Sequence, residues 1–479
     1  MRKSFITLIP AEEKVNYNLI RNWDEFFQNT DAEAVPKGTI LKIRKTIFQF
    51  DVFIKGVLDV GIEFEDCYFT ASLGFYNATL HHEIRLNRCF IDDDLLVTSL
   101  DNEFKKNFDI INVTVQHKVI ISGGTFQVCH WSFKSEPEVY IHGGAFKELV
   151  IGYWGGASIS TLTLELGDVK GLIRVVDKKT SIDKLSLMRH ALEANVTLQD
   201  FSVNYLSIYN YRNEKGLRIS NIVPMKGDKP SEFAITEAYL GKAEFYSIDF
   251  NLFDIFKIVD AHLVECSFVN IKWATIILAL KGRSIYQTED EKALPEKIQR
   301  LESRQYVNIA EKNQLERDIQ VVIYYEKKRE VLRQLKYALS KQGDVINEQR
   351  FHSLEMNAHK RTLKDDKDFW TKWIIQFSYI FSDFGQSISR PIIGLLSIHF
   401  CLFFILVVSG VLAPLHFSIS HPTFSGFNEG VYQFFRLINP LRKADDTFKG
   451  VLILIDLAMR IWSSYMIYNI ARASRRFIK

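Results

Sequence analysis

The chain has 479 residues, with 60 Lys and Arg against 57 Asp and Glu, which gives a net charge of +3. This balance disfavours a nucleic-acid-binding protein, and the length is enough for about two to four domains. Five scattered cysteines without a Cys-x-x-Cys pair disfavour a disulfide framework or a zinc site. We therefore expect reduced, buried thiols, no cofactor, no metal and no nucleic-acid partner.

Residues 1–40 are expected to form an amino-terminal cap. They begin with Arg2 and Lys3, but the apolar run that follows is short and ends before Glu12 and Glu13. A secretory signal peptide needs a longer apolar region, so the sequence predicts that the long amino-terminal part stays in the cytoplasm.

Residues 41–280 show short alternating apolar segments that repeat. Residues 62–69 align with residues 84–91, and residues 121–126 align with residues 141–146, at offsets of 22 and 20. Apolar triplets that begin at Leu185, Val196, Leu206 and Leu217 recur every 10 or 11 residues. Alternation predicts strands, and a fixed repeat predicts a solenoid in which inward side chains stack. We predict a parallel β-helix with Cys67 and Cys89 in an inward stack, while other all-β folds, such as a β-sandwich, stay open.

Residues 285–366 are charged, poor in glycine and helical in period. Gly343 suits a left-handed helix end, and Asp344 can cap the next helix, so a helical hairpin is predicted. Its expected interface combines two groups of apolar residues: Leu332, Leu335 and Leu339 on one helix, and Phe351, Leu354 and Met356 on the other.

Residues 368–479 are predicted to form a membrane domain. Residues 391–415 carry no charge and residues 451–470 are apolar apart from Asp456 and Arg460, so both are long enough to cross a bilayer as helices. The preceding residues 368–388 are expected to lie on the bilayer surface, with Trp370 and Trp373 as interfacial anchors. Residues 427–437 are too short to span and predict a surface helix or a re-entrant helix that Pro440 ends.

Positive residues flank both spans. Lys360, Arg361, Lys364, Lys367 and Lys372 precede the first, and Arg472, Arg475, Arg476 and Lys479 follow the second. The positive-inside rule predicts cytoplasmic amino and carboxyl ends in a multi-pass protein of the inner membrane, although the connecting loop is also basic.

The second predicted span contains the main candidate site. Asp456 and Arg460 lie four residues apart in the order that favours an intrahelical pair, and Ser463 and Ser464 follow on the same predicted polar side. These residues form either a self-neutralised pair that helps helices associate or a polar stripe that lines a pore. A two-helix subunit encloses no pore, so conduction requires a homo-oligomer.

Two stretches of the chain resemble bacterial pentapeptide-repeat-type membrane proteins: residues 332–344 with 351–356, and residues 381–387 before a proline-led span. The resemblance implies a right-handed β-helix, then a helical hairpin, then an ion-channel-like two-helix end, with a role in bacterial defence against phage. The repeats here are not clean pentapeptides, and residues 436–440 replace the backbone filter of a potassium channel.

Three functions follow from these features. The leading one is a non-enzymatic membrane protein whose β-helix binds a partner or signal and whose two-helix end anchors it and forms an oligomeric pore. The second is a non-conducting scaffold. The third is a β-helix enzyme that cleaves polysaccharides, for which Asp92, Asp93 and Asp94 form the dense acidic cluster, although a solvated turn explains them better. His81, His82 and Glu83 are adjacent, and neighbouring residues on a strand point apart, so a metal site is not expected there.

Overall fold

The structure, a computed structural model, describes residues 18–20, 38–153, 155–225, 230–274, 309–363, 369–408, 424–443 and 450–474. Of residues 18–20, 309–324 and 424–426 it describes the backbone alone. Predictions for residues 1–17, 21–37, 275–308, 364–368, 409–415 and 475–479 therefore lie outside the described residues. The chain divides into two compact units, Met1–Gln334 and Leu335–Lys479, which are described separately.

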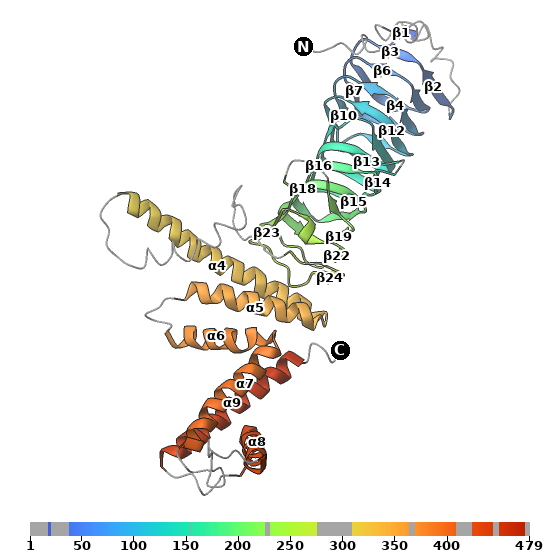
Figure 1. Cartoon of the computed structure of the whole chain (residues 1–479). Coiled ribbons are helices and arrows are strands. Elements are labelled where there is room, and N and C mark those ends of the chain that lie inside the picture. Colours follow the sequence, from blue (N-terminus) through green and yellow to red (C-terminus); the bar gives the residue numbers. More distant parts are fainter. Residues whose placement is uncertain are drawn as a thin grey trace. The chain divides into compact units, whose positions relative to one another are not determined.

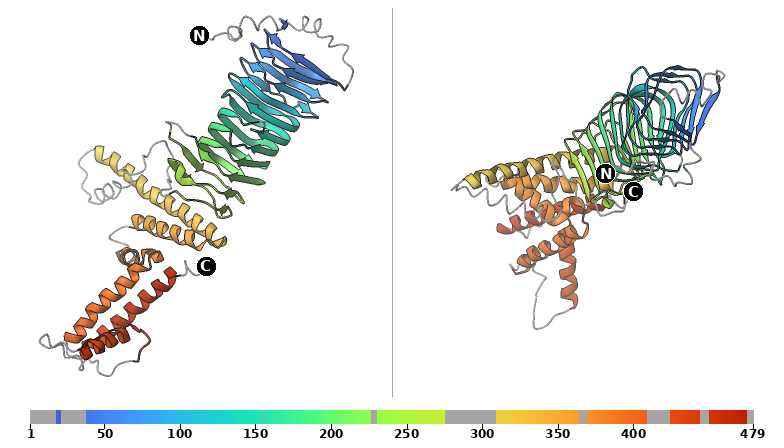
Figure 2. Two further views of the ribbon diagram at one scale, coloured as in Figure 1. Left: turned by 45° about the vertical axis from the view of Figure 1, so that its right-hand side comes forward. Right: turned by 90° about the horizontal axis from the view of Figure 1, so that it is seen from above.

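The first unit is a parallel β-helix of about ten turns, as predicted (Figures 1 and 2). Its strands are β1 (Asn18–Ile20), β2 (Ile40–Arg44), β3 (Thr46–Phe48), β4 (Val52–Leu58), β5 (Gly61–Glu65), β6 (Tyr68–Phe69), β7 (Leu73–Leu80), β8 (Ile84–Asn87), β9 (Phe90–Ile91), β10 (Leu95–Val97), β11 (Glu103–Phe104), β12 (Phe108–Val115), β13 (Lys118–Phe133), β14 (Glu138–Ile151), β15 (Ser158–Val175), β16 (Ser181–Ala191), β17 (Glu193–Gln199), β18 (Ser202–Asn213), β19 (Gly216–Ser220), β20 (Val223–Pro224), β21 (Glu232–Thr236), β22 (Glu244–Tyr246), β23 (Ile255–Val259) and β24 (Ser267–Val269), with the short 3-10 helix η3 (Phe250–Leu252).

The repeats seen in the sequence are the turns of this β-helix. Ile62 pairs with Ile84, and Ile121 pairs with Ile141, in parallel registers that confirm both predicted alignments. The shorter repeat is half a turn, because Leu185 pairs with Leu206 while Val196 pairs with Leu217. Each turn therefore contributes strands to more than one face, and every second repeat returns to the same face.

Columns of aromatic and thiol side chains fill the interior. Phe104, Phe126 and Phe146 stack with ring centroids 4.6 and 4.7 Å apart. Cys67 and Cys89 occupy equivalent buried positions in adjacent turns, which confirms the predicted inward stack, and burial raises the pKa of the Cys89 thiol. Each fully buried large apolar side chain contributes about 1.5–3 kcal/mol of transfer free energy, so the repeated stacks stabilise the unit.

Corners between strands use the left-handed backbone region at non-glycine residues. Four residues that lie at the same corner in consecutive turns have φ between 47° and 55°: Lys45, Asp66, Arg88 and Asn112. Asn and Asp adopt this conformation at the least cost, whereas Lys and Arg require support from their surroundings. That support is visible where the Arg88 guanidinium donates two hydrogen bonds of 2.8 and 2.9 Å to the Asp66 carboxylate and holds its pKa below the usual value.

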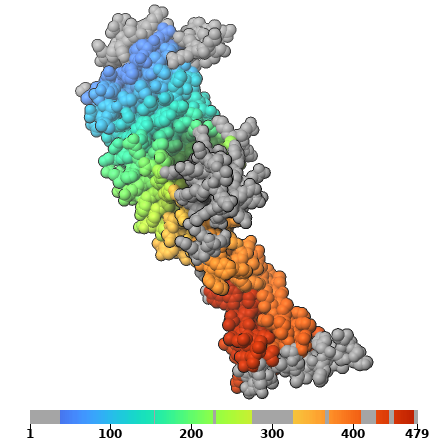
Figure 3. All heavy atoms as spheres, turned by 90° about the vertical axis from the view of Figure 1, so that its left-hand side faces the viewer, coloured from blue at the N-terminus to red at the C-terminus, as the bar shows by residue number. Residues whose placement is uncertain are grey.

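The second unit, with the end of the first, contains the helices. They are α4 (Ile309–Lys341), α5 (Val345–Thr362), α6 (Phe369–Ser382), the 3-10 turn η4 (Asp383–Gly385), α7 (Ser389–Val408), α8 (Phe424–Ile438) and α9 (Val451–Ser474). α7 and α9 lie side by side, orange and red in Figure 3, and α6 and α8 pack against them. Leu406, Leu437 and Met459 form the buried core between α7, α8 and α9.

The predicted turn between α4 and α5 is confirmed. Gly343 has φ 74°, and the Asp344 carboxylate accepts a hydrogen bond of 3.1 Å from the backbone N–H of Asn347. The predicted interface is only partly correct: Leu335, Leu339 and Phe351 are buried, but Leu354 and Met356 are half-buried. The helix turns Glu355 inward instead.

Glu355 is held by Lys336, at a distance of 2.6 Å. Burial alone would raise the pKa of this carboxyl, but hydrogen bonds from His352 and Lys336 outweigh it and lower the pKa to about 2. Lys336 and Glu355 therefore both stay charged, and the ammonium group of Lys336 neutralises the inward carboxylate. The apolar pattern of α5 did not predict that this carboxylate points inward.

Replacing Phe126 by Ala should remove the middle ring of the aromatic column and lower the free energy of unfolding by about 3–5 kcal/mol. Phe126→Leu should cost less because it retains most of the buried volume. Urea unfolding of the full chain in detergent, followed by circular dichroism, measures both, with the exposed Tyr209→Ala as control. Equal losses for Phe126→Ala and Tyr209→Ala would contradict the role of the column.

Candidate functional site

The helices α7 and α9 are long and apolar enough to cross a membrane. Within the most apolar 18-residue stretch of each, only 28% and 22% of the residues are buried. A core helix of a water-soluble protein would be mostly buried, whereas here large apolar side chains such as Phe404, Val408, Leu454 and Ile461 are more than half exposed. These two helices therefore fit a membrane anchor.

The helix α6 presents aromatic side chains next to these two helices. Trp370 is 77% exposed and Trp373 is 49% exposed. Trp373, Phe377 and Phe381 follow one another at ring-centroid distances of 5.8 and 5.5 Å, and Phe381 contacts Trp462 of α9 at 4.8 Å. One end of this row is thus attached to α9, while the two tryptophans predicted as interfacial anchors stay on the surface.

The predicted pair within α9 is present. Arg460 Nε donates a hydrogen bond of 2.8 Å to Asp456 Oδ2 one helical turn away. The Asp456 side chain is 12% exposed and that of Arg460 is 23% exposed, so the pair is largely withdrawn from the surface. Among the four residues of the candidate stripe, Ser463 continues this inner face and is fully buried, whereas Ser464 is exposed on another face of the helix.

Arg442 is the third member of the cluster, and the sequence pattern did not indicate it. It follows α8, and its guanidinium donates hydrogen bonds to the Asp456 carboxylate and to the backbone oxygen of Leu437. Arg460 in turn donates to the backbone oxygen of Arg442 at 2.9 Å. Asp456, Arg460 and Arg442, called here the arginine–aspartate cluster, thus tie the segment after α8 to α9.

The cluster has more positive than negative charge. Two guanidiniums share one carboxylate, and among the described residues Nε of Arg442 is buried without a hydrogen-bond partner. Within the same described part of the helical unit, both ring nitrogens of the buried His399 and the Ser463 hydroxyl also lack a partner. Buried polar groups without partners are rare in proteins and costly, so these groups mark the inner face of the helices as a candidate functional region.

The segment between α6 and α7 contains a second unusual feature. Asp383, Phe384 and Gly385 have φ of 48°, 55° and 90°, which places three consecutive residues in the left-handed region. Phe384 is buried, Ser353 of α5 donates to the Asp383 carboxylate at 3.3 Å, and Gln386 donates to the backbone oxygen of Gln349 at 3.0 Å. Contacts from α5 therefore support the backbone of η4, and this joint determines how the chain enters α7.

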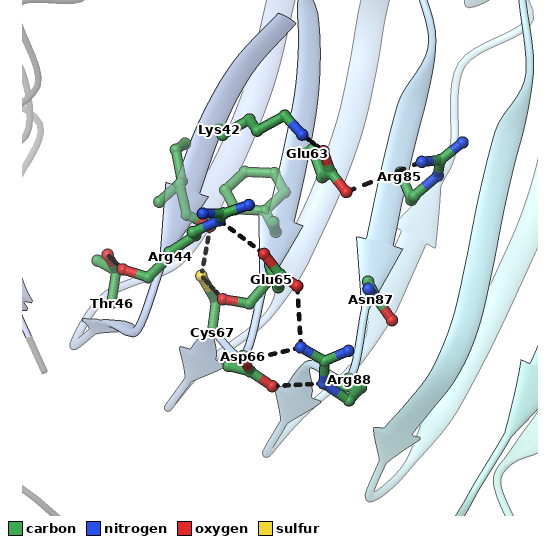
Figure 4. A network of polar contacts seen from close by, with 12 residues as sticks. Lys42, Arg44, Thr46, Glu63, Glu65, Asp66, Cys67, Arg85, Asn87 and Arg88 are labelled. Carbon is green, nitrogen blue, oxygen red and sulfur yellow. Dashed lines mark hydrogen bonds and ion pairs between the residues drawn. The ribbon is translucent and has the colours of Figure 1, made fainter.

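On the β-helix, charged side chains stack in ladders of alternating sign. Lys42 pairs with Glu63 at 3.0 Å, and Glu63 pairs with Arg85 at 3.8 Å (Figure 4). The series continues from Arg85 to Asp109 at 3.9 Å and ends where Asp109 contacts the His130 ring at 3.0 Å. Each partner comes from the next turn, so the ladder neutralises charge between neighbouring turns. Stabilisation of the stacked turns is a sufficient explanation for this charge ladder.

The acidic cluster considered for glycan cleavage lies at a bend. Asp93 accepts a hydrogen bond from the Ser72 hydroxyl at 3.1 Å, and Asp94 accepts one from the backbone N–H of Lys118 at 3.0 Å. These carboxylates thus connect neighbouring turns of the β-helix at a corner. This position agrees with the chain reversal that the sequence predicted for the acidic cluster.

The expectation that His81 and His82 lie on a strand and point apart is wrong. Both residues lie at a bend and approach Oδ1 of Asp59, at 3.8 and 3.6 Å. Over the described ranges no group of three or more His, Cys, Asp or Glu side chains has an arrangement that could hold a metal ion. The expectation of buried thiols also fails at one position, because Cys401 lies on the exposed apolar side of α7.

The sequence matches no protein-family model, and neither a curated protein nor a solved structure is significantly similar to it. The class of protein is therefore defined by its own architecture: a parallel β-helix followed by a helical hairpin and two helices that fit a membrane anchor.

Replacing Asp456 by Asn should leave two inward guanidiniums without a counter-charge and lower the free energy of unfolding by about 3 kcal/mol. Arg442→Gln should cost less, because Asp456 and Arg460 still neutralise each other. Thermal unfolding of the full chain in detergent measures both, and Ser464→Ala, on the exposed side of α9, is the control. A larger loss for Arg442→Gln than for Asp456→Asn would contradict the charge balance described here.

Proposed function

We propose that this chain is a membrane-anchored β-helix protein. In this proposal α7 and α9 cross the bilayer, and the β-helix remains in water as a module that binds a protein partner or a signal. The observation that carries the proposal is the exposed apolar surface of α7 and α9. In an apolar 18-residue stretch of each helix, only 28% and 22% of the residues are buried. Water is an unfavourable environment for such a surface, whereas lipid chains cover it at no cost in hydration.

The position of the other helices supports this arrangement. Trp370 and Trp373 on α6 have large exposed rings with polar N–H groups, which are favourable at the level of the lipid headgroups. The distribution of Lys and Arg supports an inner-membrane protein with both ends in the cytoplasm. The resemblance to pentapeptide-repeat-type membrane proteins, and the phage-defence role that it implies, belongs to the proposal and rests on the sequence motifs quoted above.

An anchor explains the arginine–aspartate cluster better than a pore lining does. Asp456 and Ser463 face the interior of their own subunit, and Asp456 is already bound by two guanidiniums. Such groups hold α8 and α9 together within one subunit. A non-conducting anchor is therefore compatible with the observed positions of these side chains, whereas a pore lining would require them to move.

A pore made by a homo-oligomer is the second candidate. The observation in its favour is the set of buried polar atoms without partners in the described helices: Nε of Arg442, both ring nitrogens of His399 and the hydroxyl of Ser463. Polar groups inside a membrane protein are costly and often belong to an ion pathway. In this case α7, α8 and α9 would rearrange on assembly so that these groups contact water.

Membrane insertion can be tested by flotation. The full chain should float with liposomes after an alkaline carbonate wash, because its apolar helices lie in the hydrocarbon layer. A form truncated before Asp368 should remain in the aqueous fraction. A full chain that the wash releases, while circular dichroism shows it folded, would contradict the anchor.

Conduction can be tested by ion flux through liposomes that contain the full chain. The anchor predicts the same leakage as from liposomes with the form truncated before Asp368, because the polar groups of a single subunit face inward. Flux that requires the helices, and that changes in His399→Phe protein of normal stability, would instead establish the pore.

A further inference from the structure

Positive side chains gather at the end of the helical unit where α6 and η4 lie. α6 runs across one end of α7 and α9, and η4 connects it to α7 (Figure 1). α7 has 20 residues, which corresponds to about 30 Å, the thickness of the hydrocarbon layer of a bilayer. In the proposed anchor, the first turn of α7 and the joint before it therefore lie at the level of the lipid headgroups.

Arg472 reaches this joint from the last turn of α9. A Cβ atom on Gly385 would lie only 3.1 Å from Cδ and Nε of Arg472, so the arginine side chain lies directly against the backbone of η4. The glycine permits this close approach. Within the described part of the chain, the Arg472 guanidinium forms no hydrogen bond or ion pair. Packing thus holds in place a positive group whose N–H donors are still available.

Arg390 reaches the same joint from the first turn of α7. Its Nη1 donates a hydrogen bond of 3.2 Å to the backbone oxygen of Tyr379 and lies 3.8 Å from Oδ2 of Asp383. The side chain is exposed, and a guanidinium has five N–H groups, so Nε and Nη2 can still donate to another acceptor. Asp383 also accepts a hydrogen bond from Ser353. One carboxylate that already has partners therefore accompanies two guanidiniums at η4.

A second group of cations lies where α5 meets the polar face of α6. Lys360 of α5 donates a hydrogen bond to Gln376 of α6, which is one helical turn after Lys372. Burial, and then the charges of Arg361 and Lys372, lower the pKa of the Lys360 ammonium group. Cations that are close enough to repel one another in this way favour the approach of an anion.

The other face of α6 is apolar and uncovered. Trp370, Ile374 and Phe377 follow one another at helical spacing and are all exposed. Cations beside an exposed aromatic face are typical of a helix that lies in the plane of the bilayer surface. Its apolar side chains then lie among the acyl chains, and its cations lie among the headgroups.

From these positions we propose that the joint at η4 binds the headgroups of anionic phospholipids, such as phosphatidylglycerol. The proposal rests on the membrane anchor and goes beyond it, because an anchor alone requires no lipid of a particular charge. Arg390 and Arg472 bind one phosphate beside η4, and the cations between α5 and α6 attract further anionic headgroups.

The chemistry of the groups favours this partner. Guanidinium N–H groups match the oxygens of a phosphate with two parallel hydrogen bonds, and basic groups near a bilayer surface are attracted to anionic lipids. Phosphatidylcholine also has a phosphate, but its choline group adds a positive charge that the arginines repel. By contrast, Arg442 and Arg460 already share the Asp456 carboxylate inside the subunit and need no lipid partner.

The test measures which lipids surround the full chain in liposomes of phosphatidylcholine. A small fraction of the lipid is pyrene-labelled phosphatidylglycerol or, in a parallel sample, pyrene-labelled phosphatidylcholine. Energy transfer from the tryptophans to pyrene reports how strongly each probe gathers at the protein. The anionic probe should be preferred about tenfold, and Arg390→Gln together with Arg472→Gln should reduce this preference to about twofold or less. Equal transfer to both probes, or a preference that the double variant retains, would overturn the proposal.

Two controls separate the site from general effects of charge and folding. Arg390→Lys together with Arg472→Lys keeps both charges and should keep most of the preference. Lys443→Gln removes an exposed charge near Arg460 rather than near η4 and should leave the preference unchanged. A loss as large in Lys443→Gln as in the double glutamine variant would show that the preference does not arise at η4 and would overturn the proposal.

Two further measurements identify the partner. If inorganic phosphate abolishes the preference and chloride of the same ionic strength does not, the site binds the free ion and the lipid proposal is wrong. Flotation with pure phosphatidylcholine liposomes distinguishes this proposal from the anchor. A chain that resists the carbonate wash there but shows no preference keeps the anchor and contradicts only the lipid site. A folded chain that the wash releases contradicts both.

Discussion

Each turn of the β-helix depends on the next turn for its backbone hydrogen bonds and for the burial of its inward side chains. A single turn has unpaired N–H and C=O groups on both edges and an apolar interior that is open at both ends. The structure meets this constraint by repetition, with parallel pairing, stacked rings such as Phe104 and Phe126, and charge ladders such as Lys42, Glu63 and Arg85. Near the carboxyl end of the β-helix, α4 provides one such partner, because Gln334 accepts a hydrogen bond from the backbone N–H of Leu263.

The apolar helices near the carboxyl end of the chain also require a covering surface. α7 and α9 bury a narrow inner face against each other and against α8, around Leu406, Leu437 and Met459. Their outer faces stay apolar and uncovered, and a bilayer provides the cover that another turn provides in the β-helix. The arginine–aspartate cluster is compatible with this environment because its charges are paired inside the subunit rather than presented to lipid.

Much of this architecture could be predicted from local patterns. The repeat offsets correspond to registers such as Ile62 with Ile84, because stacked turns require similar residues at equal spacing. Gly343 and Asp344 could be assigned because a helix end and a helix cap depend on neighbouring residues. The pair of Asp456 and Arg460 followed from helical geometry in the same way.

Features that depend on distant contacts could not be predicted. Arg442 joins Asp456 only because α8 and its following segment fold back on α9, and its sequence neighbours suggest an ordinary basic loop. The attachment of α4 to the β-helix joins segments far apart in the sequence, because the backbone N–H of Leu263 donates to Gln334, 71 residues further along the chain. The left-handed conformations of Asp383 and Phe384 likewise depend on support from α5.

The most direct test of the account asks what surrounds the outer face of α9. Ile461→Cys, at a position that is 62% exposed, is spin-labelled in a Cys401→Ser background and reconstituted in liposomes. The collision rates of the label with oxygen and with a water-soluble nickel complex are then compared with those at Tyr76→Cys on the β-helix. The account predicts high oxygen and low nickel accessibility at position 461, and the reverse at position 76. High nickel accessibility at position 461 would place α9 in water and contradict the membrane anchor.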